Sequence, residues 1–304
     1  MGAHMPNARS VGDLTENTGK DPRQSGPTAL RILVGAQLRR MRESQGITRE
    51  AAGYAIRGSH SKISRLELGR STFKARDVAD LLSLYGVVEE TERSALLILA
   101  ERANAVGWWH ECRDAVPDWF DTYLGLEQDA ALIRTYAVQF VPGLLQTEDY
   151  ARAVLGRAHE DAPESVEPRV ALRMRRQRIL APPTSHRLWV VMDESVLRRR
   201  VGDAAVMRAQ LDHLREMAAR PNVTIQLLPL DYGGNVGGVG SVTILRFAEA
   251  EVKDVVYMEQ IASAQYLTKQ SDVDPYQQLM NELGMHARPA TDTPAILGEI
   301  MTAL

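Results

Sequence analysis

Apolar residues recur at helical spacing from residue 28 to residue 104, which predicts an all-helical N-terminal region. The first predicted helix begins at Thr28, a residue type that caps helix N-termini, and ends near Gly46. Its apolar stripe consists of Leu30, Leu33, Val34, Leu38 and Met41. Cap and periodicity signals predict four further helices, which begin at Thr48, Ser59, Asp77 and Glu89.

The second and third predicted helices are short and meet through the turn Arg57-Gly58, as in a helix-turn-helix. In the third helix, Ile63 and Leu66 are expected to face the core. The opposite face presents hydroxyl, imidazole and cationic groups, on His60, Ser61, Lys62, Ser64 and Arg65. Such groups can donate and accept hydrogen bonds at base edges in the DNA major groove. A basic face that is merely solvated is the alternative interpretation.

Strand and helix patterns alternate in the rest of the chain, which predicts an α+β domain with a small sheet. Strands are expected at 188–192, 223–230, 241–247 and 255–259. Helices are expected from Glu148, after Pro168, at 204–219 and at 273–283, while Leu132–Tyr136 is either a strand or a helix end.

The predicted domains follow from these patterns. A disordered tail is expected at 1–28, a helix-turn-helix domain at 29–105, an α+β effector or partner-binding domain at 106–285 and a C-terminal tail at 286–304. The first tail is rich in Gly, Pro, Ser and Asn, and its first five residues look like a remnant of cloning.

Charge is distributed unevenly along the chain. Residues 29–76 contain eleven Lys or Arg side chains and three Glu, a net charge of +8. Residues 77–304 carry −11, because the whole chain carries −3 and residues 1–28 are neutral. A basic domain joined to an acidic one is typical of a polyanion-binding module with a partner domain that does not bind the polyanion.

Several classes of function find no support in the sequence. Cys112 is the only cysteine, so neither an internal disulfide nor a Cys/His zinc pattern exists. No run of about 18 apolar residues could cross a membrane, and no signal peptide is present, so cytoplasmic localisation is expected. Nucleophile-elbow and HExxH patterns do not occur, and Gly233–Gly240 precedes a strand and lacks the lysine of a phosphate loop. We expect no metal, no cofactor and no enzymatic activity, and interpret the glycine run as a flexible connection or lid.

Two stretches of the predicted C-terminal domain each allow two interpretations. Aromatic residues gather at Trp108, Trp109, Trp119, Phe120 and Tyr123. They either line a ligand pocket or partner surface or, as we favour, seal the junction between the domains. The predicted helix after Pro168 carries Arg169, Arg173, Arg175, Arg176 and Arg178. It either contacts nucleic acid or, as we favour, is paired with acidic neighbours.

A set of residues at fixed spacing runs through the helical region. It comprises Leu38 to Glu43, Gly46-Ile47-Thr48, Ala51-Ala52, Ser59-x-Ser61-x-Ile63-Ser64-Arg65-Leu66-Glu67-x-Gly69, Asp77-Val78 and Leu81-Leu82-x-x-Tyr85-Gly86. With this pattern the region resembles the XRE family of Cro and phage-repressor type regulators.

The XRE resemblance implies roles for individual residues. It implies a structural ion pair between Arg42 and Glu67, and base contacts by His60, Ser61 and Arg65. Contacts to DNA phosphates or bases are expected from Thr48, Arg49, Lys62, Ser64 and Arg70. Arg49 stands where the family commonly has glutamine, so the base preference of relatives cannot be carried over to this chain.

A second set of blocks covers nearly all of residues 107–285. The blocks are Gly107-Trp108-Trp109, Trp119-Phe120, Ile133 to Tyr136, Val141 to Ala151, Asp193 to Arg199 and Val256 to Glu259. They resemble the uncharacterised C-terminal domain of WhiJ-like regulators, a large actinobacterial group. The resemblance implies a regulator of development or antibiotic production, often encoded beside a small partner protein that it binds. It supplies no catalytic or ligand residue.

The expected function is therefore sequence-specific binding of double-stranded DNA by a transcriptional regulator, most simply a repressor. A homodimer would place two recognition helices about 34 Å apart, so the operator is expected to be an inverted repeat. The C-terminal domain is expected to sense a small partner protein or a small-molecule effector. The alternatives are an antitoxin-like protein that autoregulates its operon, and an enzyme carried by the C-terminal domain.

Overall fold

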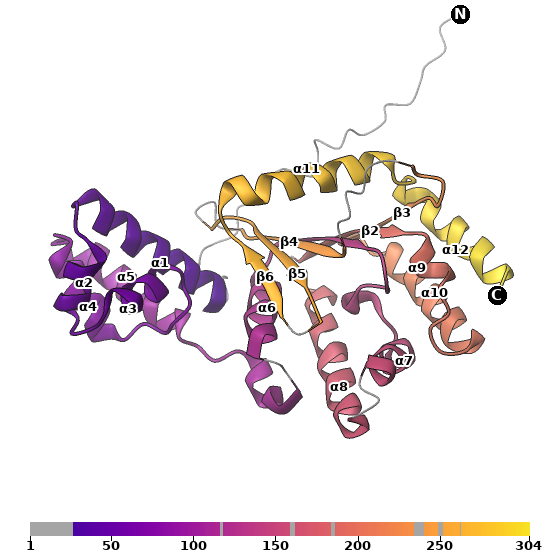
Figure 1. Cartoon of the computed structure of the whole chain (residues 1–304), viewed down its shortest axis with the longest axis horizontal. Helices are drawn as coiled ribbons and strands as arrows, with labels where there is room; N and C mark the ends of the chain where they lie inside the picture. Colours follow the sequence, from indigo (N-terminus) through magenta and orange to yellow (C-terminus); the bar gives the residue numbers. More distant parts are fainter. Residues whose placement is uncertain are drawn as a thin grey trace, which may run out of the picture.

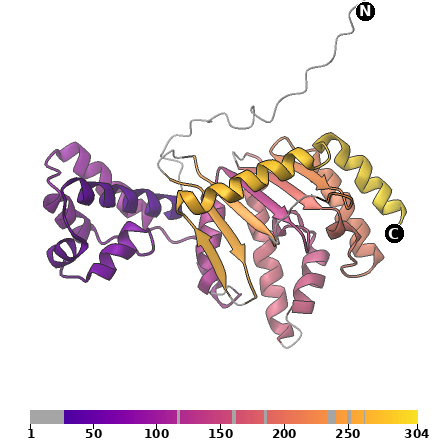
Figure 2. The ribbon, with the colours of Figure 1, turned by 45° about the horizontal axis from the view of Figure 1, so that its top comes forward.

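The computed structural model describes residues 27–115, 118–158, 162–183, 186–233, 240–248, 252–261 and 263–304. A helical bundle at the N-terminal end is followed by a larger part in which helices surround a sheet (Figures 1 and 2). This arrangement confirms the predicted fold class, an all-helical helix-turn-helix region followed by an α+β region. None of the helices in the described part is long and apolar enough to span a membrane.

The helical bundle has the five predicted helices among its described residues. These are α1 (Pro27–Ser44), α2 (Arg49–Ala55), α3 (His60–Glu67), α4 (Ala75–Leu84) and α5 (Glu90–Ala103). The side chains of Thr48 and Ser59 accept hydrogen bonds from the N–H groups of Ala51 and Lys62, at 3.2 Å each, and so cap α2 and α3. The backbone reverses between these helices at Arg57, which has a left-handed φ of 52°.

The C-terminal part contains one sheet, in which the described strands lie in the order β3-β2-β1-β4-β5-β6. The strands are β1 (Leu132–Ala137), β2 (Arg187–Asp193), β3 (Val223–Leu228), β4 (Val242–Arg246), β5 (Val255–Glu259) and β6 (Ala264–Leu267). β1, β2 and β3 run parallel, with Ile133 opposite Leu188. The remaining neighbours pair antiparallel. Apolar residues on both faces of the central strands are buried, as expected for a sheet covered on both sides.

Helices cover the sheet unequally. The face that carries Tyr136, Trp189 and Val191 packs against α11 (Gln270–His286), which runs along the top of the sheet in Figure 1. The opposite face and the β3 edge carry α6 (Asp118–Asp129), α7 (Glu148–Ala158), α8 (Val166–Arg176), α9 (Ser195–Arg198), α10 (Ala204–Ala218) and α12 (Thr293–Thr302). Short 3-10 helices occupy Trp108–Ala115 (η3), Gly143–Leu145 (η4), Pro163–Ser165 (η5), Gln177–Leu180 (η6) and Ala290–Asp292 (η7).

The structure resolves one ambiguous element and adds three that the sequence did not predict. Residues 132–136, ambiguous in the sequence, form the central strand β1. Strand β6 and helix α6 were not predicted. Residues 286–304 were expected to be a tail, but α12 buries Leu297 completely, and the hydroxyl of Thr293 donates to the Ile225 carbonyl at 2.7 Å. The glycine run predicted as a connection or lid falls mostly on residues 234–239, outside the described residues.

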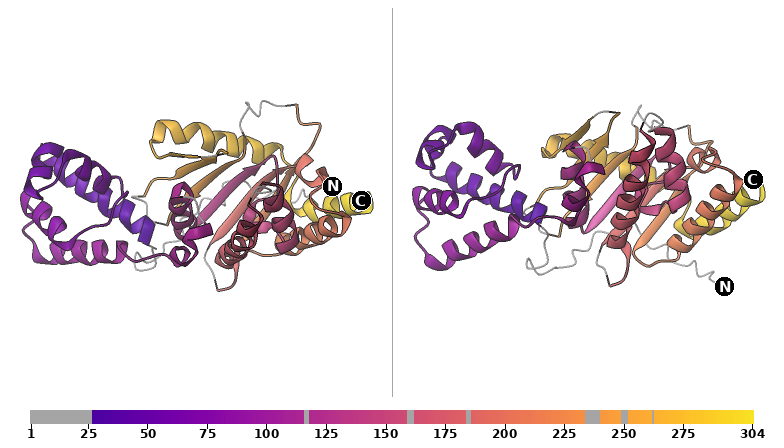
Figure 3. Two further views of the ribbon diagram at one scale, coloured as in Figure 1. Left: turned by 60° about the horizontal axis from the view of Figure 1, so that its bottom comes forward. Right: turned by 90° about the horizontal axis from the view of Figure 1, so that it is seen from below.

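The first turn of α1 joins the two parts of the molecule (Figure 3). Thr28 and Ala29 are buried, and the Ala29 N–H donates to Oδ2 of Asp129 in α6 at 2.7 Å. Gly125 of α6 lies directly against the Thr28 hydroxyl, so close that a Cβ there would overlap it. One helix therefore begins on the C-terminal part and ends within the helix-turn-helix.

Candidate nucleic-acid interface

Recognition helix α3 is held in place by close backbone contacts that only glycine permits. A Cβ at Gly35 of α1 would lie 2.5 Å from the Leu66 carbonyl oxygen. A Cβ at Gly53 of α2 would lie 2.9 Å from the Gly58 carbonyl oxygen in the turn. Ile63 and Leu66 are 1% and 2% exposed, so the inner face of α3 is buried as the sequence predicts.

The outer face of α3 carries the residues expected to contact bases. His60, Ser61 and Arg65 are all exposed. The Ser61 hydroxyl lies 3.4 Å from Nε2 of His60. Arg65 forms no ion pair with the described part of the chain, so its guanidinium is available to a ligand. The arrangement places an imidazole, a hydroxyl and a cation on one accessible helix face, which is the chemistry that reads base edges.

Glu67, at the end of α3, is the centre of a buried charge network. Arg42 of α1 donates from Nε to Oε1 of Glu67 at 2.5 Å and from Nη2 to Oε2 at 3.1 Å. The Arg42 guanidinium also donates to the Ile47 carbonyl at 2.8 Å. The hydrogen bond to Glu67 raises the pKa of Arg42, which is 7% exposed. The ion pair implied by the XRE resemblance is thus present in this chain, and it ties α1 to α3.

Arg49 is a third member of this network. Its Nε donates to Oε2 of Glu67 at 3.0 Å, while its side chain remains 39% exposed. The guanidinium therefore lies at the start of α2 with one edge fixed and the other edge turned toward solvent. The pairing with Glu67 restricts where the Arg49 side chain can reach.

Lys62 is also held by an acidic partner that the sequence did not reveal. Its Nζ lies 2.6 Å from Oδ2 of Asp77, near the start of α4. This ion pair ties α3 to α4 and leaves Lys62 less free than its neighbours. Thr48 and Arg70 are exposed and Ser64 is half-buried.

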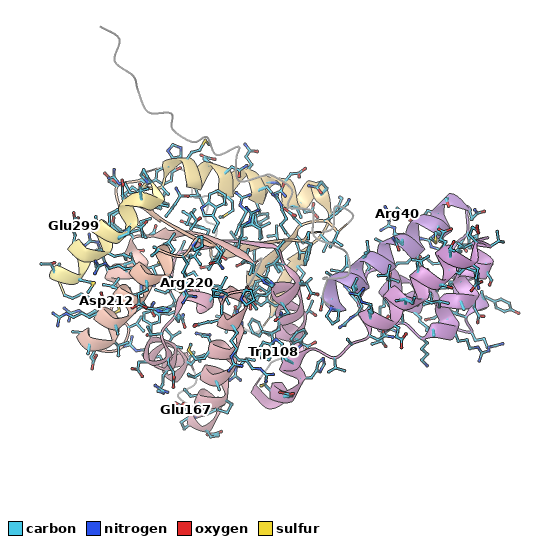
Figure 4. All side chains as sticks on the ribbon, turned by 180° about the vertical axis from the view of Figure 1, so that it is seen from behind. Arg40, Trp108, Glu167, Asp212, Arg220 and Glu299 are labelled. Carbon is cyan, nitrogen blue, oxygen red and sulfur yellow. The ribbon has the colours of Figure 1, made fainter. Side chains whose placement is uncertain are left out.

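The aromatic residues after α5 are connected by contacts: Trp108 and Trp109 meet edge to face with ring centroids 6.0 Å apart, and Phe120 packs beside them. Trp109 is buried against Leu124 and Leu172, and its Nε1 donates to Asp121 at 2.8 Å. Trp108, labelled in Figure 4, lies under the guanidinium of Arg175, 4.4 Å from the ring centroid. Phe120 and Tyr123 stack on each other, and Tyr123 packs on Tyr257 of the sheet. The side chain of Trp119 lies outside the described residues.

The basic helix predicted after Pro168 is α8, which begins earlier, at Val166, and its arginines have different surroundings. Arg175 pairs with Glu111, and Arg176 pairs with the buried Glu127, both at 2.8 Å. Arg173 has an amide partner instead of a carboxylate. The expectation of acidic partners is therefore correct for Arg175 and Arg176. It is wrong for Arg173, whose partner is the amide of Gln146.

Comparison with protein families assigns both parts of the chain. A helix-turn-helix domain model matches residues 33–96, which include most of α1, all of α2 to α4 and the first half of α5. A model described as a domain of unknown function (DUF5753) matches residues 120–299, more than half of the chain. The protein belongs to the DUF5753 family. No curated protein and no solved structure matches the chain significantly.

The two matches define how the interface relates to the rest of the molecule. The helix-turn-helix match shows a DNA-binding domain and supports a function in regulation. The DUF5753 match extends into α12, as far as residue 299, in agreement with the packing of that helix on the sheet. Asp129, which accepts a hydrogen bond from the Ala29 N–H, belongs to the DUF5753 domain.

Proposed function

We propose that the protein is a sequence-specific transcriptional repressor whose DUF5753 domain senses a small ligand or a small partner protein. The observation that carries the proposal is the geometry of α3. Its inner face is buried, its end is fixed through Glu67, and its outer face presents His60, Ser61 and Arg65 to solvent. A rigid helix with accessible polar groups is the structure that the major groove accepts.

Domain roles follow from this proposal. Residues 29–105 bind DNA, and the positive charge of 29–76 attracts the phosphate backbone. The net negative charge of the DUF5753 domain disfavours contact with the DNA phosphates, so this domain is assigned the sensing role. The XRE resemblance supports a homodimer on an inverted repeat, since two recognition helices then enter successive major grooves.

Helix α1 supplies the connection that a sensor needs. Its first turn is bound by Asp129 and Gly125 of α6, while Arg42 near its other end holds Glu67 of the recognition helix. A shift of α6 would therefore move the helix against which α3 is oriented. Such a rigid element, held at both ends, can transmit a change between domains.

The test is selection of bound DNA from a random-sequence library by the purified protein, followed by sequencing. The proposal predicts an enriched inverted repeat, with at least one base pair per half-site that loses enrichment in Arg65→Ala. Arg178→Ala, which removes an exposed arginine of η6, is the matched control and is expected to select the same sequence. Enrichment of no sequence by the wild-type protein would contradict the proposal.

A further inference from the structure

Arg173 and Arg176 of α8 are neighbouring cations on the side of the sheet opposite α11. Arg176 is 8% exposed, and its Nε and Nη2 donate to the two carboxylate oxygens of Glu127 at 2.8 Å each. The rings of Phe120 and Tyr123 lie 5.1 and 5.5 Å from this guanidinium. The carboxylate of Glu127 is therefore already engaged in a bidentate pair with Arg176.

Arg173 has no carboxylate partner within the described residues. Its Nη1 donates to Oε1 of Gln146 at 2.7 Å, and no other hydrogen bond to the described part of the chain is made by this guanidinium. Gln146 is 3% exposed, and its Nε2 donates to the Val141 carbonyl at 2.6 Å, which directs the amide oxygen toward Arg173. An arginine carries several N–H donors, so most of those on Arg173 remain available.

Burial, and then the charge of Arg176, lower the pKa of Arg173 to about 10. Glu259, exposed at the end of β5, and Glu127 act in the opposite direction. Arg173 nevertheless stays protonated at neutral pH. The domain thus holds a charged guanidinium in a partly desolvated position, where an added anion would interact more strongly than on an open surface.

The guanidinium groups of Arg173 and Arg176 both lie beside Gly143 of η4. A Cβ at this position would lie 3.7 Å from Nε of Arg173 and 3.7 Å from Nη1 of Arg176. The two cations therefore face one point next to the Gly143 backbone. Gly143 and Arg173 are half-buried, whereas Arg176 is buried. Arg169, one turn earlier on α8, has a buried Nε without a partner among the described residues.

We propose that Arg173 and Arg176 bind one anionic group, a carboxylate or a phosphate, of a small ligand beside Gly143. The planar donor forks of two arginines match the oxygen geometry of either group. The site lies close to the domain junction along α6: Glu127 contacts Arg176, while Gly125 and Asp129 of the same helix hold the start of α1. That this site regulates DNA binding rests on the proposed function, whereas anion binding at the site does not require DNA.

The experiment is thermal unfolding of the full-length protein titrated with sodium phosphate or sodium acetate, against sodium chloride at matched ionic strength. We expect saturable stabilisation by phosphate, by acetate or by both, beyond the chloride effect; which of them stabilises identifies the group. Arg173→Gln is expected to weaken the binding about tenfold or more, because it removes a charged hydrogen-bond donor. Gly143→Val, which places methyl groups between the two cations, is the second variant.

Two controls separate this site from other cations. Arg178→Gln changes an exposed arginine near the same helix, and Arg65→Gln changes the recognition helix; both are expected to keep the wild-type anion response. Equal stabilisation by chloride, or a response that disappears in Arg65→Gln and persists in Arg173→Gln and Gly143→Val, would overturn the proposal. DNA selection that fails while the anion response persists would overturn the proposed function and leave this site standing.

Discussion

Arg42 and Glu67 join the first helix of the bundle to the end of the recognition helix through two hydrogen bonds of 2.5 and 3.1 Å. Both side chains are nearly inaccessible to solvent, at 8% and 2% exposed. A buried ion pair contributes little net stability when intact, but the loss of one partner leaves an uncompensated charge. This relationship makes the orientation of α3 depend on Arg42, a buried residue of α1.

Glu67→Gln is therefore expected to destabilise the protein. It removes the buried carboxylate that Arg42 and Arg49 share and leaves Arg42 only the exposed Glu43 as an anionic partner, at a cost of about 3 kcal/mol in the free energy of unfolding of the helical domain. Urea unfolding followed by circular dichroism measures this change. Glu50→Gln, which changes an exposed glutamate in the same region, is the control and is expected to stay near wild type. Equal stability of the two variants would rule out a structural role for the pair.

Arg65→Ala is expected to weaken operator binding by about 1–3 kcal/mol and to relax specificity at one base pair, because Arg65 is exposed on the outer face of α3. Affinities for the selected operator and for its single-base variants measure both effects. A uniform loss across all variants would make Arg65 a phosphate contact instead. Unchanged affinity would remove it from the interface.

Arg49→Ala is expected to weaken binding to all sequences and to reduce the slope of log K against log salt by about 1, if its free edge contacts a phosphate. Because Arg49 also donates to Glu67, unfolding of the variant must be measured alongside. Arg49→Lys keeps the charge and is expected to restore most of the salt slope. A loss confined to one base sequence would identify Arg49 as a base reader.

Gly125→Val is expected to release the first turn of α1 from α6, since a Cβ there would lie 2.1 Å from the Thr28 hydroxyl. Faster amide exchange at residues 28–31 in hydrogen-exchange mass spectrometry is the expected result. Gly298→Val is the matched control, because no atom lies within 4 Å of its Cβ position. Protection of residues 28–31 that matches the wild type would show that α1 is not held through this contact.

Local signals were sufficient to predict the helical bundle. Thr48 and Ser59 cap α2 and α3 as their residue types indicate, and the apolar stripe of α1 is buried except for the half-buried Met41. Within the predicted Arg57-Gly58 turn, Arg57 adopts the left-handed conformation. Caps and periodicity depend on residues close in sequence, which explains why these predictions succeed.

Contacts between distant segments were less accessible to sequence reasoning. The pairing of Lys62 with Asp77 depends on the docking of α4, and the close approach at Gly35 depends on where α3 crosses α1. Strand β6 is short and half-exposed and therefore lacks a clear apolar pattern. Arg173 of α8 meets Gly143 and Gln146, at and directly after η4, only in the folded chain. No local sequence pattern predicts this contact.

The most direct test of the account is binding of the purified protein to DNA from its own upstream region, at two salt concentrations and with a scrambled competitor. The account predicts binding that the scrambled DNA does not compete away and that weakens steeply as salt rises, as expected for several phosphate contacts. Weak binding that the scrambled DNA removes equally well would contradict the assignment of α3 as a sequence-reading helix.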